Sequence, residues 1–220
     1  MCIMRVEWIG HACFKVYLND GRELLFDPFK NIGYEMQETE ADVVLISHDH
    51  YDHNAVDRVR GDYKLVTGPG TWDIDGIHIE GYETDHDKNA GNDRGKTVIY
   101  KVQAEGLTLV HMGDICVMPD NALYDALKGV DILMIPVGGT FTVDAEEALE
   151  ICKTLEPNII IPMHYKTDDL DMDIAPLFGF MDAAGRYFDK SSSGASTLEL
   201  VAGDKKKRSR IVILENKANC

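Results

Sequence analysis

Six consecutive residues hold most of the candidate metal chemistry of this chain. Residues 48–53 read His-Asp-His-Tyr-Asp-His and follow the apolar run 43–46. Imidazole and carboxylate groups together suit zinc, manganese or iron, whereas a solvated polar loop would be unusual with three histidines in six positions. We expect Asp49 and Tyr51, at alternate positions, to point away from the site. The expected metal ligands of this motif are His48, His50, Asp52 and His53.

Three more candidate ligands each follow an apolar run further along the chain. They are His86, Asp114 and His164. Taken singly, His86 would belong to an exposed polar loop, Asp114 would be a turn residue and His164 a core histidine. Because each follows a predicted strand, all three can lie with residues 48–53 at one edge of a sheet, where α/β proteins place their sites.

The order of these residues resembles the metallo-β-lactamase fold superfamily. The pattern is His-x-His-x-Asp-His, then a lone His, then Gly-Asp, then a lone His, and it extends to about residue 167. Other segments are similar to a small stand-alone branch that contains metal-dependent hydrolases and ascorbate-6-phosphate lactonase. These segments are Trp8–Ala12, Leu25–Pro28, Pro136–Thr142 and Ile161–Tyr165.

The resemblance implies two divalent metal ions, with zinc expected and manganese or iron as alternatives. His48, His50 and His86 would hold one ion, Asp52, His53 and His164 would hold the other, and Asp114 would bridge them. Two cations about 4 Å apart repel strongly, so a shared carboxylate and a shared hydroxide are needed between them. The expected activity is attack of a metal-bound hydroxide on a small ester, lactone or phosphoester, with Asp52 and Asp114 as catalytic residues.

Five further residues are expected near these ligands. Asp27 matches the early aspartate of the family and would accept a hydrogen bond from a ligand imidazole. His11, after a glycine at a strand end, would also lie behind the ligands. Gly138, Gly139 and Lys166 would contact the substrate, the glycines by close backbone approach and the lysine by binding an anion. A plain strand-to-helix connection and a surface lysine are the alternatives for these three.

Hydrophobic periodicity predicts strands in the first half of the chain and β-α alternation in the second. With the resemblance, this predicts an α/β protein with a four-layer αβ/βα sandwich, as a single domain over residues 1–220. Helices are expected at 121–128, 144–155 and 174–184, and a short one from about residue 54. A final hairpin is expected from 197–201 and 211–214, with the basic run 205–208 in its turn.

Composition narrows the partners of the chain. The formal net charge is −16, and such a surface repels nucleic acid and anionic membranes, so a small-molecule substrate is expected. The five cysteines are odd in number and form no Cys-x-x-Cys pair, which favours a reducing cytoplasm over a disulfide framework. No signal peptide and no run of about 20 apolar residues is visible. The sequence leaves homo-oligomerisation open.

Two other functions fit the same ligands. An iron-dependent redox or metal-sensing module is the first, and a protein that retains metal without turnover is the second. An acidic residue in place of a motif histidine would indicate the oxygen-reducing members of the superfamily. His48, His50 and His53 are all histidine here, which favours hydrolysis.

Overall fold

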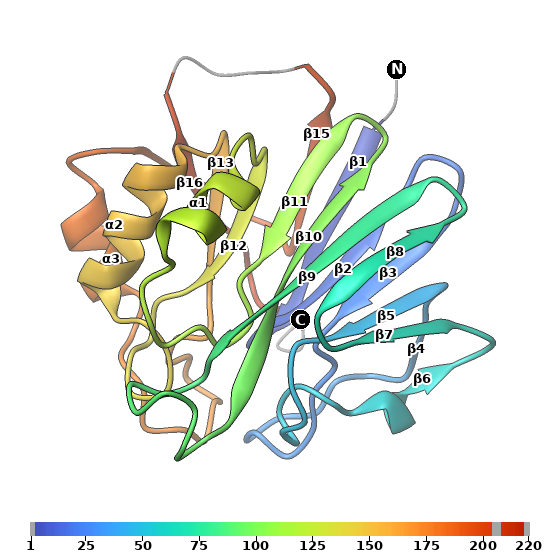
Figure 1. The fold of residues 1–220 in the computed structure, drawn as a ribbon, viewed down its shortest axis with the longest axis horizontal. Coiled ribbons are helices and arrows are strands. Elements are labelled where there is room, and N and C mark those ends of the chain that lie inside the picture. Colours follow the sequence, from blue (N-terminus) through green and yellow to red (C-terminus); the bar gives the residue numbers. More distant parts are fainter. Residues whose placement is uncertain (1–2, 204–207, 218–220) are drawn as a thin grey trace.

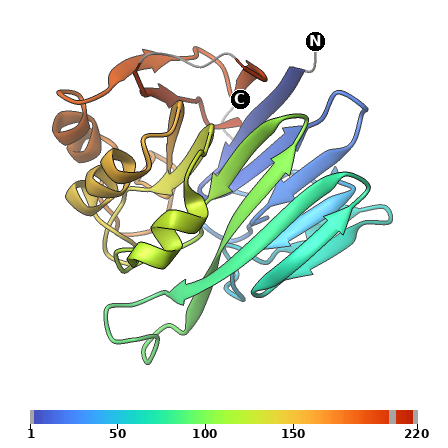
Figure 2. The ribbon, with the colours of Figure 1, turned by 45° about the horizontal axis from the view of Figure 1, so that its top comes forward.

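The computed structural model of this protein describes residues 3–203 and 208–217. Two β-sheets pack face to face, and three helices cover the outer face of the larger sheet (Figures 1 and 2). The six-stranded sheet runs in the order β15 (Thr197–Val201), β1 (Ile3–Gly10), β2 (Cys13–Tyr17), β3 (Glu23–Phe26), β5 (Val43–Ile46) and β7 (Lys64–Thr67).

The larger sheet has eight strands and is mixed. Its order is β14 (Asp189–Ser192), β16 (Arg210–Ile213), β13 (Ile159–Met163), β12 (Ile132–Pro136), β11 (Leu107–His111), β10 (Lys96–Ala104), β9 (Ile77–Asp85) and β8 (Gly70–Ile74). The strands from β8 to β11 pair antiparallel, and those from β11 to β14 pair parallel. A separate two-stranded sheet joins β4 (Thr39–Glu40) to β6 (Val59–Arg60).

Alternating side chains of the smaller sheet pack into two separate apolar clusters on its two faces. Val43 and Leu45 face the main core between the sheets, whereas Val44 and Ile46 face a second cluster on the outer side. Successive strand residues point to opposite faces, so a continuously apolar strand such as β5 requires a cover on both sides. On the outer side that cover comes from loop residues such as Phe29 and Ile32.

The expected α/β sandwich is confirmed, with one difference in its outer layers. Helices α1 (Asn121–Leu127), α2 (Ala145–Leu155) and α3 (Phe178–Ala184) lie beside the eight-stranded sheet (Figure 1). Next to the six-stranded sheet, the described residues form loops, the small β4/β6 sheet and a single 3₁₀ turn, η1 (Val56–Arg58). The short helix expected near residue 54 is this turn.

Helix α2 begins with a capping box. The Asp144 carboxylate accepts hydrogen bonds from the backbone N–H groups of Glu146 and Glu147, at 3.1 and 3.0 Å. The Glu147 carboxylate accepts one in return from the backbone N–H of Asp144, at 3.0 Å. Three otherwise unpaired backbone donors are thereby satisfied, and Asp144 is the last residue of the connection from β12 to this helix.

Replacing Asp144 with alanine should therefore lower the free energy of unfolding by about 1 kcal/mol, because the first turn of α2 loses its side-chain acceptor. Urea denaturation followed by circular dichroism measures the change. Asp182→Ala, which lies late in α3 away from any helix start, serves as the control. Equal midpoints for the wild type and the Asp144 variant would contradict the capping role.

The hairpin predicted for the carboxyl-terminal region is wrong. Strands β15 and β16 form no hairpin, because β15 pairs with β1 in the smaller sheet and β16 lies between β13 and β14 in the larger. Both strands have apolar alternation, and that pattern cannot say which open sheet edge each will join. Most of the basic run expected in the turn, residues 204–207, lies outside the described residues.

The last helix begins at Phe178 rather than at residue 174. The preceding segment is held by backbone contacts instead, since Ala175 N–H donates to the Gly138 carbonyl at 2.8 Å and Pro176 pairs with Lys166 in an isolated bridge. The residue before a proline is disfavoured in helical conformation, which explains the later start.

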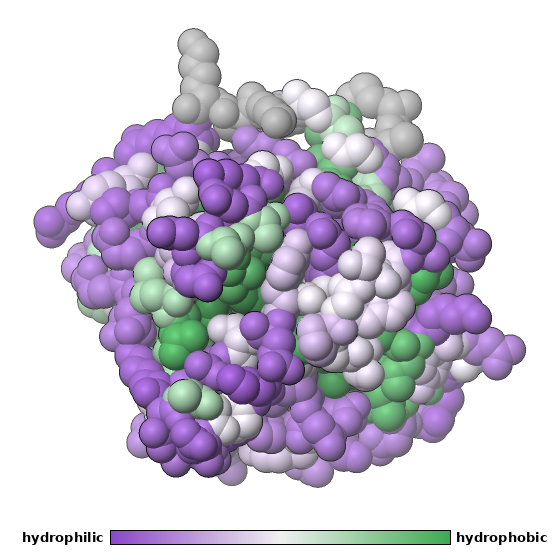
Figure 3. Space-filling model, viewed as in Figure 1, coloured by the Kyte–Doolittle hydropathy of each residue, from purple (hydrophilic) through white to green (hydrophobic). Residues whose placement is uncertain are grey.

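The face shown in Figure 3 is mostly hydrophilic, with apolar side chains confined to separate small patches. Among the described residues, the helices are all too short or too polar to cross a bilayer.

Candidate metal centre

The residues expected to form a site come together at one edge of the two sheets. Strands of the smaller sheet deliver three groups: β1 ends at Gly10 before His11, β3 at Phe26 before Asp27, and β5 shortly before residues 48–53. Strands β9, β11 and β13 of the larger sheet are followed by His86, Asp114 and His164. Ligand candidates from both sheets therefore meet across the seam between them.

Three histidines form one compact group at this edge. His50 Nδ1 lies 3.0 Å from His48 Nε2 and 3.3 Å from His86 Nε2. The turn that carries His50 is closed by the backbone N–H groups of His53 and Asn54, which both donate to the His50 carbonyl at 2.9 Å. Burial, together with the neighbouring His53, lowers the pKa of His48 from 6.5 to about 2. A neutral imidazole is the form that binds a metal.

Asp114 lies at the centre of the cluster. Its Oδ2 atom is near the Nε2 atoms of four histidines: His164 at 3.2 Å, His53 at 3.3 Å, His86 at 3.7 Å and His48 at 4.0 Å. The residue is 2% exposed. Burial alone would raise the pKa of its carboxyl group, but His164 and His53 hold it well below the usual value. One anionic oxygen is thus shared among imidazoles from both sheets.

A second group surrounds Asp52. Its Oδ2 atom lies 3.3 Å from His11 Nε2 and 3.5 Å from His53 Nε2. Single ligand atoms of Asp52, His53, His164 and His11 all lie within 4.8 Å of one another. The His11 and His164 rings are 4.1 Å apart between centroids. His11 is therefore placed where it can orient Asp52.

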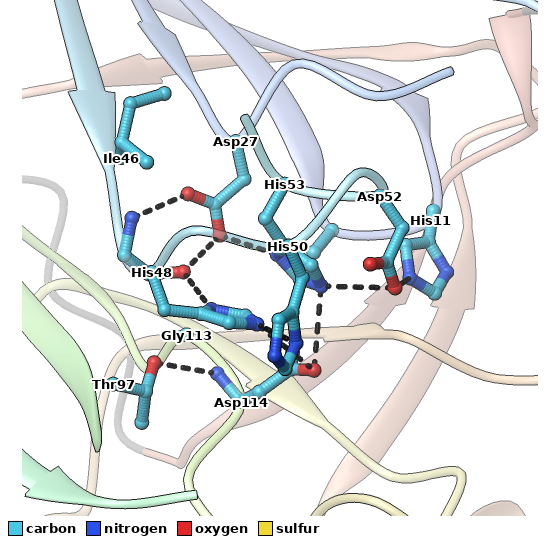
Figure 4. A network of polar contacts seen from close by, with 12 residues as sticks. His11, Asp27, Ile46, His48, His50, Asp52, His53, Thr97, Gly113 and Asp114 are labelled. Carbon is cyan, nitrogen blue, oxygen red and sulfur yellow. Dashed lines mark hydrogen bonds and ion pairs between the residues drawn. The ribbon is translucent and has the colours of Figure 1, made fainter. Parts of the chain in front are cut away.

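Asp27 holds the back of this cluster in place (Figure 4). Its Oδ2 atom lies 2.8 Å from His53 Nδ1 and accepts a hydrogen bond from the Ser47 hydroxyl at 2.6 Å, while Oδ1 accepts one from the Ser47 N–H at 2.7 Å. The Ser47 hydroxyl also lies 2.9 Å from His48 Nδ1. Burial alone would raise the pKa of Asp27, yet the adjacent His53 lowers it overall. The network leaves the Nε2 atoms of both histidines facing Asp114.

Three site residues have a backbone conformation that is uncommon outside glycine. His11, Asp27 and His164 have φ angles of 51°, 43° and 50°. Each immediately follows a strand, and the left-handed conformation turns the chain sharply so that the side chain enters the cluster. Such strain persists only where the surrounding packing imposes it, and it is common at functional sites.

Gly113 lies where the turn before Asp114 contacts residues from both sheets. Its φ is 52°, and a Cβ atom there would lie 2.7 Å from Thr97 Oγ1 and 2.9 Å from the Ser47 side chain. The Asp114 N–H donates to Thr97 Oγ1 at 3.3 Å. Glycine is required here because the two sheets touch at this point.

The donor set fits divalent metal ions. Within the described part of the chain, His53 Nε2 and Asp114 Oδ1 are buried polar atoms that lack a hydrogen-bond partner, although both face this cluster. Buried polar groups are normally satisfied, so exceptions that converge on one place indicate a missing ligand. Imidazole nitrogens and carboxylate oxygens are the donors that zinc, manganese and iron accept.

Gly138, Gly139 and Lys166, which are expected to contact the substrate, lie near this centre but differ in what they contact. A Cβ atom at Gly138 would lie 2.2 Å from the His164 carbonyl oxygen, so its close approach is to the protein backbone. Gly139 lines a pocket that also contains His86. The Lys166 ammonium donates to the backbone carbonyls of Leu170 and, at 2.9 Å, Met172. Substrate contacts by these three residues stay predictions.

Two positioning residues of the cluster were not predicted from the sequence. Ser47 links Asp27 to His48, and Thr97 receives the Asp114 N–H. Neither has a distinctive pattern, since a serine after a buried strand and a threonine that begins one are common. Asp87, whose carboxylate accepts four backbone N–H groups of the loop after His86, was not predicted either, although the turn-forming residues that follow it were a usable signal.

His11 gives a pH-dependent prediction for the protein stripped of metal by a chelator. Burial and the nearby His164 lower the pKa of His11 from 6.5 to about 4. Between these pH values the unfolded chain binds a proton that the folded protein excludes, so stability is lost as the pH falls. The loss from this residue approaches about 3 kcal/mol near pH 4.

Urea denaturation at several pH values tests this prediction. His11→Asn should lose less stability than the wild type as the pH falls from 6.5 to 4. The control is His78→Asn, because His78 is only partly buried and lies outside the cluster, and this variant should follow the wild type. Parallel curves for the wild type and His11→Asn would refute the assignment.

Comparison with known proteins agrees with this fold and site. Residues 5–164 match the family model of the beta-lactamase superfamily domain. A UPF0173 metal-dependent hydrolase of Thermococcus kodakarensis is 30% identical over 196 residues, which cover 75% of this chain and 86% of that protein. A crystal structure from Thermotoga maritima, described as a zinc-dependent hydrolase of the metallo-beta-lactamase superfamily, is 32% identical, with a TM-score of 0.78 over 96% of this chain and 98% of that one.

A more distant structure shares only the fold. CmlA, a diiron β-hydroxylase from Streptomyces venezuelae, is 15% identical, with a TM-score of 0.64 over 96% of this chain and 53% of that one. The paired sheets and the His- and Asp-rich edge define a metallo-β-lactamase fold. The chain belongs to the beta-lactamase superfamily.

Proposed function

We propose that this protein is a dinuclear metal-dependent hydrolase that cleaves a small ester, lactone or phosphoester. The observation that supports it most is the position of Asp114 Oδ2, within 4.0 Å of imidazole nitrogens from four histidines. One carboxylate between two groups of ligands is the arrangement that two neighbouring cations need, because it screens their repulsion. The names of its relatives, which include metal-dependent hydrolases, agree with this proposal.

The proposed ligand sets follow the two groups of side chains. His48, His50 and His86 would hold one ion, and Asp52, His53 and His164 the other, with Asp114 between them. Divalent ions held there would supply a water of lowered pKa as nucleophile and would polarise the oxygen of the electrophile. Zinc is the proposed metal.

Neighbouring side chains orient the proposed ligands, and a pocket leads to them from the surface. Asp27 and Ser47 keep His53 and His48 turned toward Asp114, and His11 holds Asp52. An open pocket of about 600 Å³ leads to the centre, with Asp52 and Asp114 among its lining residues. Its size suits a small organic molecule rather than a polymer.

Elemental analysis and a substrate screen test the proposal together. The purified protein should contain close to two zinc ions per chain. The metal-loaded protein, but not the chelated one, should hydrolyse at least one member of a panel of p-nitrophenyl esters, lactones and phosphodiesters. Stoichiometric iron with a visible absorption band that responds to reductant would instead support the redox alternative. A metal-loaded protein that leaves the whole panel intact would count against hydrolysis.

A further inference from the structure

The loop that follows His86 is organised around one buried carboxylate. Asp87 is 6% exposed, and its two oxygens accept four backbone N–H groups. The donors are Asn89 at 2.8 Å, Gly91 at 2.9 Å, Asp93 at 3.0 Å and Arg94 at 2.8 Å. The His86 N–H also donates to the Gly95 carbonyl at 3.1 Å. The backbone of Arg94 is therefore held in a fixed position relative to His86.

The Arg94 side chain projects from this loop toward the pocket over the candidate metal centre. Its guanidinium carbon lies 3.8 Å from the centre of the Phe141 ring, so that one face of the cation is covered by an aromatic side chain. Arg94 and Phe141 both line the pocket that contains Asp52 and Asp114. Stacking of this kind restricts a guanidinium while leaving its N–H groups at the edges available.

Arg94 is the only cationic side chain that lines this pocket in the described residues. No hydrogen bond or ion pair of its guanidinium with another part of residues 3–203 or 208–217 is present. Nearby lysines are engaged elsewhere: Lys88 pairs with Glu147 at 2.7 Å, and Lys166 donates to loop carbonyls. A guanidinium with free edges in a pocket binds carboxylate or phosphate through two parallel hydrogen bonds.

The rest of the pocket rim limits the negative charge that a bound molecule can carry. Asp49, Asp171 and Asp173 also line it, and these carboxylates would repel a polyanion. Tyr51 and Met172 contribute apolar surface between the charges. The rim therefore fits a short molecule with one anionic group better than a nucleic acid or a polyphosphate.

We propose that Arg94 determines substrate specificity by binding a carboxylate or phosphate group that the substrate carries apart from the bond to be cleaved. This inference rests on the proposed metal-dependent hydrolysis and narrows its substrates to small anionic esters or lactones. Arg94 acts on the non-reacting part of the substrate, and Asp87 with Phe141 positions it.

Equilibrium binding to the metal-loaded protein tests the proposal without requiring turnover. The probes are dicarboxylates from succinate to adipate, 4-phosphonobutyrate, and butyrate as the ligand that lacks a second anionic group. The wild type should bind at least one two-headed probe more tightly than butyrate by calorimetry. Arg94→Gln should weaken that binding about tenfold or more and leave butyrate unchanged. Arg94→Lys should retain part of the preference.

Arg58→Gln is the matched control, because Arg58 pairs with Glu35 at 2.7 Å outside the pocket, and it should bind every probe like the wild type. Metal content and melting temperature confirm that each variant is folded and loaded. A larger effect on the dicarboxylates or on the phosphonate identifies the preferred anion. Equal affinities for butyrate and the two-headed probes in the wild type, or an unchanged preference in Arg94→Gln, would overturn the proposal. Failure of hydrolysis itself would appear separately, as absence of turnover across the substrate panel.

Discussion

Replacing Asp114 with asparagine is expected to lower hydrolytic turnover by at least about a hundredfold and to weaken the binding of at least one metal ion. The amide has nearly the same shape, but it removes the negative charge that faces His164, His53, His86 and His48. Without that charge, the repulsion between the two proposed ions would no longer be offset. Metal content after dialysis, measured by elemental analysis, tests the effect even before a substrate is known.

Asp49→Asn is the matched control for metal content. Asp49 lies within the same six-residue motif and lines the pocket, but its carboxylate accepts a hydrogen bond from Asn54 and is part of none of the candidate ligand groups. This variant should retain the wild-type amount of metal. Full metal content and wild-type turnover in Asp114→Asn would show that Asp114 does not bridge the ions.

Replacing Asp27 with asparagine should weaken metal binding by about ten- to a hundredfold, although Asp27 is not an expected ligand. The Ser47 N–H must keep an acceptor at Oδ1, so the new amide nitrogen replaces Oδ2. That nitrogen would donate to His53 Nδ1 and move the ring proton to Nε2. The nitrogen that faces Asp114 would then carry a proton and could not bind a metal.

Competition with a fluorescent zinc chelator measures this loss of affinity. Asp57→Asn, which removes an exposed partner of Lys30, should leave the affinity unchanged. NMR of the His53 ring would show the tautomer directly in the Asp27 variant. An unaltered tautomer with unaltered zinc affinity would mean that Asp27 does not orient His53.

Much of the site could be anticipated because strand ends are visible in the sequence. The apolar runs before residues 48–53, Asp114 and His164 predicted strands, and the structure has a strand at each of them. A strand ending in a polar ligand type places that side chain at a sheet edge, whatever the details of packing. The seven expected ligands accordingly lie together, while their roles as ligands stay predictions.

What could not be predicted depends on contacts between distant segments. Arg94 has an ordinary loop context, and only packing against Phe141 makes it part of the pocket. The pairing of β15 with β1 depends on which edge is open after the core has formed, and local alternation has no information about that choice. The hydrogen bonds from the Lys166 ammonium to loop carbonyls likewise could not be seen in the sequence, and anion binding by this lysine stays a prediction.

The division of the site between the sheets has a mechanical implication. His48 and His53 follow a strand of the smaller sheet, whereas His86, Asp114 and His164 follow strands of the larger one. Any ion held among them would link the two sheets. A relative displacement of the sheets would separate its ligands and release it. Metal affinity would then report on the stability of the packing between the two sheets, also in variants altered far from the ligands.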